Sequence, residues 1–157
     1  PAYKDIKAYS IGFFSNNPDT TQEPAFSYGN YATNLVWHEG SHIYLEDLFR
    51  KYKVQIDALE YLYNKDDQGM KSQNISNWTY CINENVVRGI VIALFKEYKG
   101  ERAWKKQNAQ EIINDFIYAE EISDMIFNEY INGIKYKNFN EFFPVLLNQI
   151  RKNHPLK

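Results

Sequence analysis

Residues 31–53 read YATNLVWHEGSHIYLEDLFRKYK, and this stretch decides how the chain folds. It contains no proline and a single glycine, and its apolar side chains recur three or four residues apart, as on one face of a helix. The apolar residues with this spacing are Leu35, Val36, Ile43, Leu45, Leu48 and Phe49. The spacing therefore predicts a helix over residues 31–53.

The same helical spacing recurs through most of the chain that follows. It predicts further helices over residues 54–64, 78–98, 108–132 and 139–152. Gly100 and Gly133 come just after two of these helices, where glycine often ends a helix, and Pro144 limits how regular the last one can be.

The N-terminal part differs, because residues 5–14 alternate in the manner of a strand and residues 15–30 have the composition of a long loop. We expect one mainly α domain over residues 1–157, with one or two N-terminal strands. Because the chain begins with Pro1 rather than Met, we also expect it to be a piece of a longer protein.

The composition of the chain argues against several classes of protein. The chain has 157 residues, 44% of them hydrophobic and 24% charged, which is typical of a globular domain rather than a disordered one. A formal net charge of −2 gives no reason to expect nucleic acid as a partner, and no apolar run approaches the length of a membrane span. The single cysteine, Cys81, excludes an internal disulfide framework and a cysteine-cluster zinc site, and we expect it in the core.

Two of the three histidines lie in the motif His38-Glu39-Gly40-Ser41-His42. On a helix, residues four apart lie one above the other, so both imidazoles can bind one metal ion. Glu39 is placed to reach a water on that metal and take its proton. Zinc suits such a site, because it accepts imidazole nitrogen and keeps a coordination position open. The alternative is that two histidines merely share a helix face.

A zinc site of this kind needs a third protein ligand, and Glu84 is the favoured candidate. It lies in an apolar stretch of the helix over residues 78–98, where a lone carboxylate is costly without a cation. Tyr80 and Arg88 flank it at four residues before and after, so an ordinary Glu84–Arg88 ion pair is the alternative. His154 is expected to be an exposed residue of the C-terminal tail.

Two acidic residues just after the motif, Glu46 and Asp47, lie too close in sequence to His42 to wrap around the same metal ion. We expect them instead to accept a hydrogen bond from a histidine N–H.

His38-Glu39-x-x-His42, followed on a separate helix by Asn83-Glu84-x-x-x-Arg88, resembles the gluzincin branch of zinc metallopeptidases. More narrowly, residues 30–100 are similar to an uncharacterised bacterial domain family that carries both motifs. The resemblance implies a zincin-like fold with an active-site helix and a third-ligand helix. It also implies zinc bound by His38, His42 and Glu84, with Glu39 as general base, and an exported bacterial protein.

The chain departs from the better-known gluzincins in two respects. They carry an aspartate a few residues after the ligand glutamate, where this chain has Arg88, and they have a sheet upstream of the motif that binds extended substrate. A hydrolase also needs a donor for the developing oxyanion. Tyr80, Arg88, Tyr28 and Tyr31 are candidates. Arg88 is favoured because the helix fixes its spacing from Glu84, and its alternative role is to hold Glu84 in place.

These features predict a zinc-dependent hydrolase, most simply a peptidase that acts on a peptide or protein substrate by means of metal-activated water. One alternative is a zinc-binding interaction or regulatory domain without turnover. Another is a zinc hydrolase that acts on a non-peptide amide.

Overall fold

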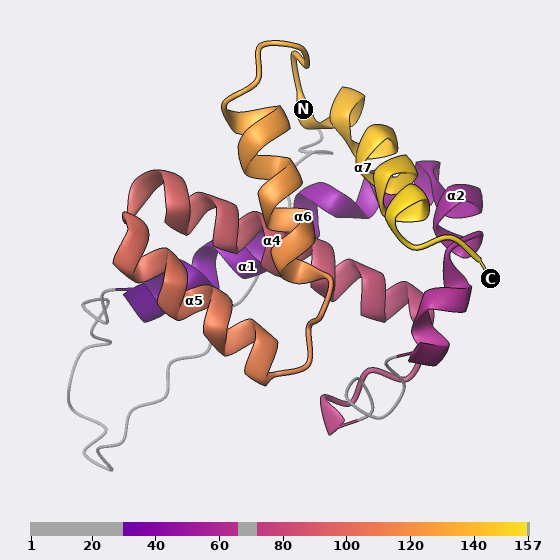
Figure 1. The fold of residues 1–157 in the computed structure, drawn as a ribbon, viewed down its shortest axis with the longest axis horizontal. Helices are drawn as coiled ribbons and strands as arrows, with labels where there is room; N and C mark the ends of the chain where they lie inside the picture. The colour runs from indigo at the N-terminus through magenta and orange to yellow at the C-terminus, as the bar shows by residue number, and fades with distance from the viewer. Residues whose placement is uncertain (1–29, 66–71, 157) are drawn as a thin grey trace, which may run out of the picture.

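The structure, a computed structural model, describes residues 30–65 and 72–156, and every regular element in these ranges is a helix (Figure 1). This confirms the mainly α prediction. The strand predicted over residues 5–14 lies outside the described residues, as does the loop over residues 15–30 apart from Asn30, which begins the first helix. No helix in the described part of the chain is long and apolar enough to span a membrane.

The elements follow one another in the order α1 (Asn30–Lys51), α2 (Lys53–Asp57), the 3-10 helix η1 (Glu60–Lys65), α4 (Trp78–Tyr98), α5 (Glu101–Ile113), α6 (Ala119–Met125), the π-helix η2 (Ile126–Ile131) and α7 (Phe139–Asn153). The helices predicted over residues 31–53, 78–98 and 139–152 are thus confirmed within two residues at either end.

Helix α4 is the centre of the fold. It contacts α1, α2, α5, α6, η1 and η2, and Figure 1 shows it passing between α1 and the α5–α6 pair. Its side chains are buried around most of its circumference, as expected for a helix with neighbours on several sides. Asn77 caps its N-terminus by accepting a hydrogen bond from the backbone N–H of Tyr80, and the helix ends two residues before Gly100. Cys81 is fully buried, which confirms its predicted place in the core.

Two helix predictions are wrong in detail. The segment 54–64 is not one helix but α2 followed by the 3-10 turn η1. The predicted helix over residues 108–132 is interrupted after Ile113, because Asp115 adopts the left-handed conformation with φ of 64°. Aspartate tolerates this conformation better than most residues, so it can stop one helix and let another begin. The chain then turns and restarts as α6 at Ala119.

A buried polar side chain on α4 holds the interruption in place. The amide oxygen of Asn85 accepts a hydrogen bond from the backbone N–H of Tyr118 at 3.1 Å, and its nitrogen donates to the carbonyl of Cys81 at 2.9 Å. Asn85 is fully buried, so both bonds offset the cost of removing the amide from water. They attach the segment between α5 and α6 to the central helix.

Gly89 lets α6 approach α4 closely. A Cβ at this position would lie 2.5 Å from Cγ2 of Ile122 and 3.2 Å from the carbonyl oxygen of Ala119. Real side chains do not pack at 2.5 Å, so any other residue at position 89 would push the two helices apart.

We expect Gly89→Ala to lower the free energy of unfolding by about 1–2 kcal/mol, because overpacking outweighs the gain of about 1 kcal/mol in helix propensity. Urea denaturation of the metal-free protein measures this. In an Ile122→Ala background, which removes the clashing Cγ2, the same substitution should cost less. An equal cost in both backgrounds would contradict close packing at Gly89.

Candidate metal centre

Helix α1 presents its two histidines side by side to α4. His38 and His42 lie one turn apart, their ring centroids are 4.8 Å apart, and their Nε2 atoms are separated by 3.1 Å. Their side chains are only 15% and 29% exposed. The i, i+4 spacing of the sequence thus brings both Nε2 atoms to one point beside α4.

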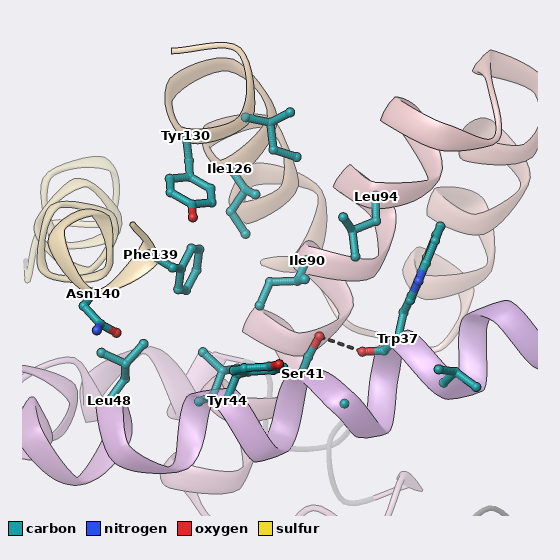
Figure 2. A pocket seen from close by; sticks show the side chains of 14 residues that line it. Trp37, Ser41, Tyr44, Leu48, Ile90, Leu94, Ile126, Tyr130, Phe139 and Asn140 are labelled. Carbon is teal, nitrogen blue, oxygen red and sulfur yellow. Dashed lines mark hydrogen bonds between the residues drawn. The ribbon is translucent and has the colours of Figure 1, made fainter. Parts of the chain in front are cut away.

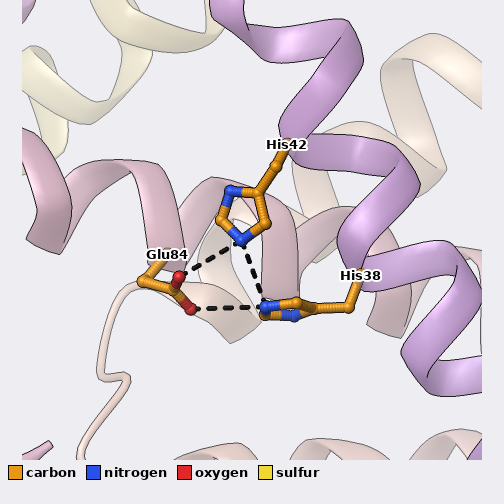
Figure 3. A group of neighbouring side chains, drawn as sticks. All are labelled: His38, His42 and Glu84. Carbon is orange, nitrogen blue, oxygen red and sulfur yellow. Dashed lines mark hydrogen bonds and ion pairs between the residues drawn. The ribbon is translucent and has the colours of Figure 1, made fainter. Parts of the chain in front are cut away.

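Helix α4 supplies a carboxylate at the same point (Figure 3). Oε1 of Glu84 lies 3.2 Å from Nε2 of His42, and Oε2 lies 3.6 Å from Nε2 of His38. Glu84 is itself largely buried, with 21% of its side chain exposed. Among the described residues these three side chains form a group that could hold a metal ion, with one ligand atom from each within 4.8 Å of the others.

The spacing of these atoms fits metal coordination. A metal ion that binds imidazole nitrogen and carboxylate oxygen tetrahedrally at about 2.0–2.1 Å holds its ligand atoms about 3.3 Å apart. The observed separations of 3.1, 3.2 and 3.6 Å lie around that value. The 3.2 and 3.6 Å separations run to different oxygens of Glu84. The two imidazole nitrogens and the carboxylate thus have about the spacing of one face of a coordination tetrahedron, with a fourth position left for another ligand.

The pKa values of the two histidines shift in opposite directions. Burial lowers the pKa of His38 to about 4, with only partial compensation from Glu84 and further lowering by Arg88. Burial also lowers the pKa of His42, but its hydrogen bonds with Glu84 and Asn83 outweigh this, so the pKa of His42 is raised. For Glu84, burial raises the pKa, whereas the hydrogen bond from His42 and the charge of Arg88 outweigh burial and lower it.

Asn83 orients one of the histidines. Nδ1–H of His42 donates to Oδ1 of Asn83 at 2.7 Å, which assigns the proton to Nδ1 and leaves the lone pair of Nε2 for a metal. We predicted this role for Glu46 or Asp47, and the prediction is wrong. Both are exposed, and Asp47 pairs with Arg50. The partner comes from α4 because the histidine points toward that helix.

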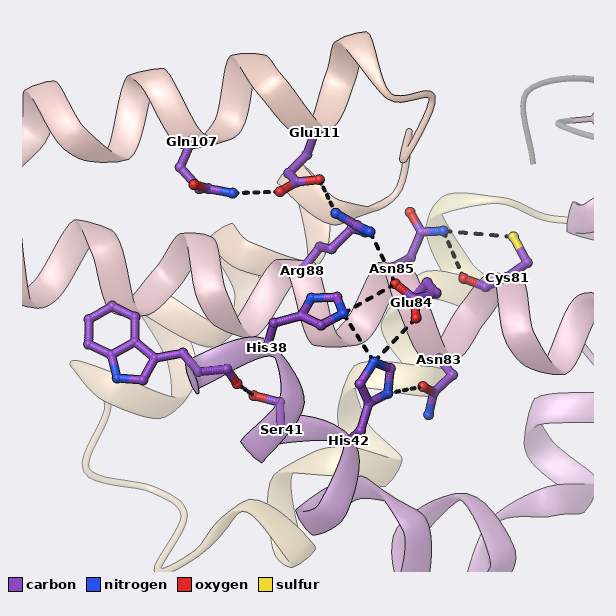
Figure 4. Close-up of polar contacts among 11 residues, drawn as sticks. His38, Ser41, His42, Cys81, Asn83, Glu84, Asn85, Arg88, Gln107 and Glu111 are labelled. Carbon is purple, nitrogen blue, oxygen red and sulfur yellow. Dashed lines mark hydrogen bonds and ion pairs between the residues drawn. The ribbon is translucent and has the colours of Figure 1, made fainter. Parts of the chain in front are cut away.

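The guanidinium of Arg88 is held from three sides, as Figure 4 shows in part. Nη2 lies 3.3 Å from Oε2 of Glu84, and Nη1 donates to Oε2 of Glu111 at 2.6 Å. The guanidinium carbon lies 3.7 Å from the centre of the Phe116 ring. The ion pair between Glu84 and Arg88 that we considered as an alternative thus exists, together with the contacts of Glu84 to the histidines. Arg88 is placed to hold Glu84, the second of its two predicted roles.

Glu111 is the residue of this cluster that sequence reasoning missed. Only 4% of it is exposed, and its second oxygen accepts a hydrogen bond from Gln107 at 2.5 Å. Nothing in the local sequence marks it, because Gln110 and Glu111 read as the solvent side of a polar helix. The burial arises from the pairing with Arg88, a residue 23 positions earlier.

The remaining candidates lie around the group rather than in it. Glu39 is half-buried on α1, and its charge contributes to the raised pKa of His42. Tyr80 lies one turn before Glu84 on α4 and is 65% exposed. Tyr28 and the side chain of Tyr31 lie outside the described residues.

His154 is not the exposed tail residue that we predicted. It is half-buried, with Nε2 2.7 Å from a carboxylate oxygen of Glu121 and its ring edge-on to Tyr118. Its backbone carbonyl accepts a hydrogen bond from the hydroxyl of Tyr61. These contacts fasten the end of α7 to η1 and α6.

An apolar pocket of about 460 Å³ lies on another face of α1 (Figure 2). Among its lining residues are Trp37, Ser41 and Tyr44 of α1, Ile90 and Leu94 of α4, and Tyr130 of η2. At 3.6 residues per turn, these α1 side chains point roughly 100° away from the two histidines. The pocket and the three ligand atoms therefore face different sides of α1.

The opposite pKa shifts predict how many protons a metal ion displaces. At about pH 6, His42 carries a proton because its pKa is raised, whereas His38 does not because its pKa is about 4. A bound metal needs both Nε2 atoms unprotonated, so binding should release one proton, and affinity should fall about tenfold per pH unit below the pKa of His42. Calorimetric titration with Zn²⁺ in buffers of different ionisation enthalpy counts the protons. A count of zero or two would contradict the assignment.

Asn83→Ala removes the acceptor that fixes the ring of His42. We expect the affinity for Zn²⁺ to fall about 10- to 100-fold, as is usual when the partner of a ligating histidine is lost. Asn77→Ala, on the same helix but away from the histidines, is the matched control and should leave the affinity unchanged. Equal affinity in Asn83→Ala and the wild type would show that Asn83 does not orient His42.

The sequence of the chain matches a known protein family. No curated protein and no solved structure matches the chain. One family model does, and its match over residues 21–149 includes all three residues of the candidate metal group. A match over most of the chain establishes membership, and it agrees with the uncharacterised family that the two motifs predict. The chain belongs to the family described as a domain of unknown function, DUF4932.

Proposed function

We propose that this chain is a zinc-dependent hydrolase that cleaves peptide bonds in a peptide or protein substrate. The observation that carries the proposal is the convergence of two Nε2 atoms and a carboxylate at one point, with Glu39 next to His38 in the sequence of the same helix. Two imidazoles and one carboxylate are a donor set that zinc accepts, and catalytic zinc sites use three protein ligands and leave a fourth position open.

Each residue of the site has a separate proposed role in binding the metal or transferring a proton. His38, His42 and Glu84 would hold the ion, and Asn83 and Arg88 would hold two of these ligands in place. Zinc in such a site acidifies a water molecule and polarises a carbonyl group. Glu39 would take the proton from the water and pass it to the leaving amine. This assignment agrees with the gluzincin resemblance of the two motifs.

Tyr80 and Arg88 remain the proposed donors to the developing oxyanion. Arg88 already contacts two carboxylates, through Nη1 to Glu111 and Nη2 to Glu84, and its remaining Nε–H is buried. Tyr80 is more exposed and lies on the same helix, one turn from Glu84. We therefore favour Tyr80 in this role and Arg88 as the residue that holds Glu84.

The engagement of Arg88 is also the observation that favours the second candidate, a metal-binding domain without turnover. Such a domain would need the three ligands and their supports, but neither Glu39 nor a free oxyanion donor. The two functions differ in what Glu39 does.

Glu39→Gln separates them. We expect the variant to bind zinc like the wild type but to hydrolyse casein or a mixed peptide library at least about 100-fold more slowly, because the general base is lost. Glu97→Gln, an exposed carboxylate near the end of α4, is the control and should keep full activity. Elemental analysis gives the metal content of all three proteins.

The outcomes decide between the candidates. Loss of hydrolysis with retained zinc supports the hydrolase. Zinc binding with no hydrolysis by the wild type supports the metal-binding domain instead. A wild-type protein that takes up no zinc contradicts both.

A further inference from the structure

One buried charge near the metal centre has no part in the chemistry proposed above. Glu111 lies on α5, which supplies no ligand, and its carboxylate is almost completely removed from water. A buried carboxylate is costly unless it is paired and hydrogen-bonded, and here it is both, through Arg88 and Gln107. Arg88 thus contacts both Glu111 and Glu84, the proposed third ligand.

We propose that Glu111 is a positioning residue, which sets the orientation of Glu84 for metal binding by dividing the donors of Arg88 between two carboxylates. The inference rests on the proposed metal centre and adds a residue that controls its affinity.

The geometry of Arg88 carries this inference. A guanidinium that faces a single carboxylate tends to bind both of its oxygens with a two-pronged pair of hydrogen bonds. Here Glu111 occupies Nη1 at 2.6 Å, so only Nη2 faces Glu84, and it does so at Oε2. Oε1 of Glu84 stays directed at His42, 3.2 Å from its Nε2. Glu111 thus keeps one oxygen of Glu84 available to a metal.

A second, independent observation shows that the two carboxylates determine where the guanidinium sits. Nε of Arg88 is buried and has no hydrogen-bond partner among the described residues. An unpartnered buried N–H is costly, so the contacts of the guanidinium with Glu84 and Glu111 must together outweigh that cost. The Phe116 ring, 3.7 Å from the guanidinium carbon, covers the guanidinium and limits its movement.

The charges also suit a cation. Two carboxylates and one guanidinium leave one net negative charge behind the two imidazoles. Without Glu111, Arg88 would cancel the charge of Glu84, and a divalent ion would meet a neutral set of ligands. Glu111 therefore acts on affinity both through the orientation of Glu84 and through the charge that Arg88 no longer cancels.

The test compares Glu111→Gln with Glu120→Gln. Both remove one carboxylate that contacts another side chain, but Glu120 binds Asn108 rather than Arg88, so it controls for charge and for the attachment of α5. We expect Glu111→Gln to lower the affinity for Zn²⁺ about 10- to 100-fold and to alter the visible spectrum of bound Co²⁺. Glu120→Gln should change neither.

Unchanged affinity in Glu111→Gln overturns the inference, and so does an equal loss in Glu120→Gln. If Glu111→Gln does not fold, the double variant Arg88→Met with Glu111→Gln removes both buried charges and should fold. In this variant no guanidinium is left to bind both oxygens of Glu84 or to cancel its charge, so it should bind Zn²⁺ within about tenfold of the wild type. A loss of about 100-fold or more in the double variant would overturn the inference, because that loss could not depend on how Arg88 divides its donors.

The result is separable from the proposed hydrolase. If the wild type binds Zn²⁺ but cleaves no peptide, the hydrolase proposal fails while the affinities still decide the role of Glu111. If the wild type cleaves peptides and Glu111→Gln binds metal normally, the hydrolase stands and this inference fails. A wild type that binds no metal overturns both.

Discussion

The register in which α1 packs on α4 determines whether a metal centre can exist in this fold. The two histidines come from one helix and Glu84 from the other, and a slip of one turn, about 5.4 Å, would separate them. Apolar packing fixes the register on both sides of the polar group. Trp37 contacts Phe95 edge-on at 5.4 Å before the motif, and Leu45 is fully buried after it. The hydrogen bond from His42 to Asn83 then adjusts the ring within that register.

The same contact explains why the two histidines differ. Both face Glu84, but His38 is more deeply buried and has Arg88 as a positive neighbour, so its neutral form is favoured. His42 gives one nitrogen to Asn83 and the other to Glu84, and this pairing favours its charged form. In the absence of metal, a proton on His42 thus partly takes the place of the cation. The groups that hold the site together with a proton are the same ones that would surround a metal ion, so the candidate ligands already lie close together.

Local patterns in the sequence mark the long helices and the residues of the candidate metal group. Long helices with apolar spacing, residues 31–53 and 78–98, were predicted within two residues, because burial of one face determines both their type and their length. The histidine pair and Glu84 were predicted because a fixed helical spacing, or a charge in an apolar stretch, marks such residues. Glu111 and His154 could not be predicted in this way. Their burial depends on partners 23 and 33 residues away, and no local pattern records such partners.

The break after Ile113 and the burial of Glu111 have one structural cause. A continuous helix over residues 108–132 could not place Glu111 beside Arg88 and also place Ile122 against Gly89. The left-handed Asp115 turns the chain, so that Glu111 reaches α4 before the turn, Phe116 covers Arg88 within it and Ile122 packs on Gly89 after it. The α4 residues that direct this path, 85, 88 and 89, lie within five residues after Glu84, the candidate ligand. One segment of α4 therefore carries the candidate third ligand and also positions the two helices that hold it in place.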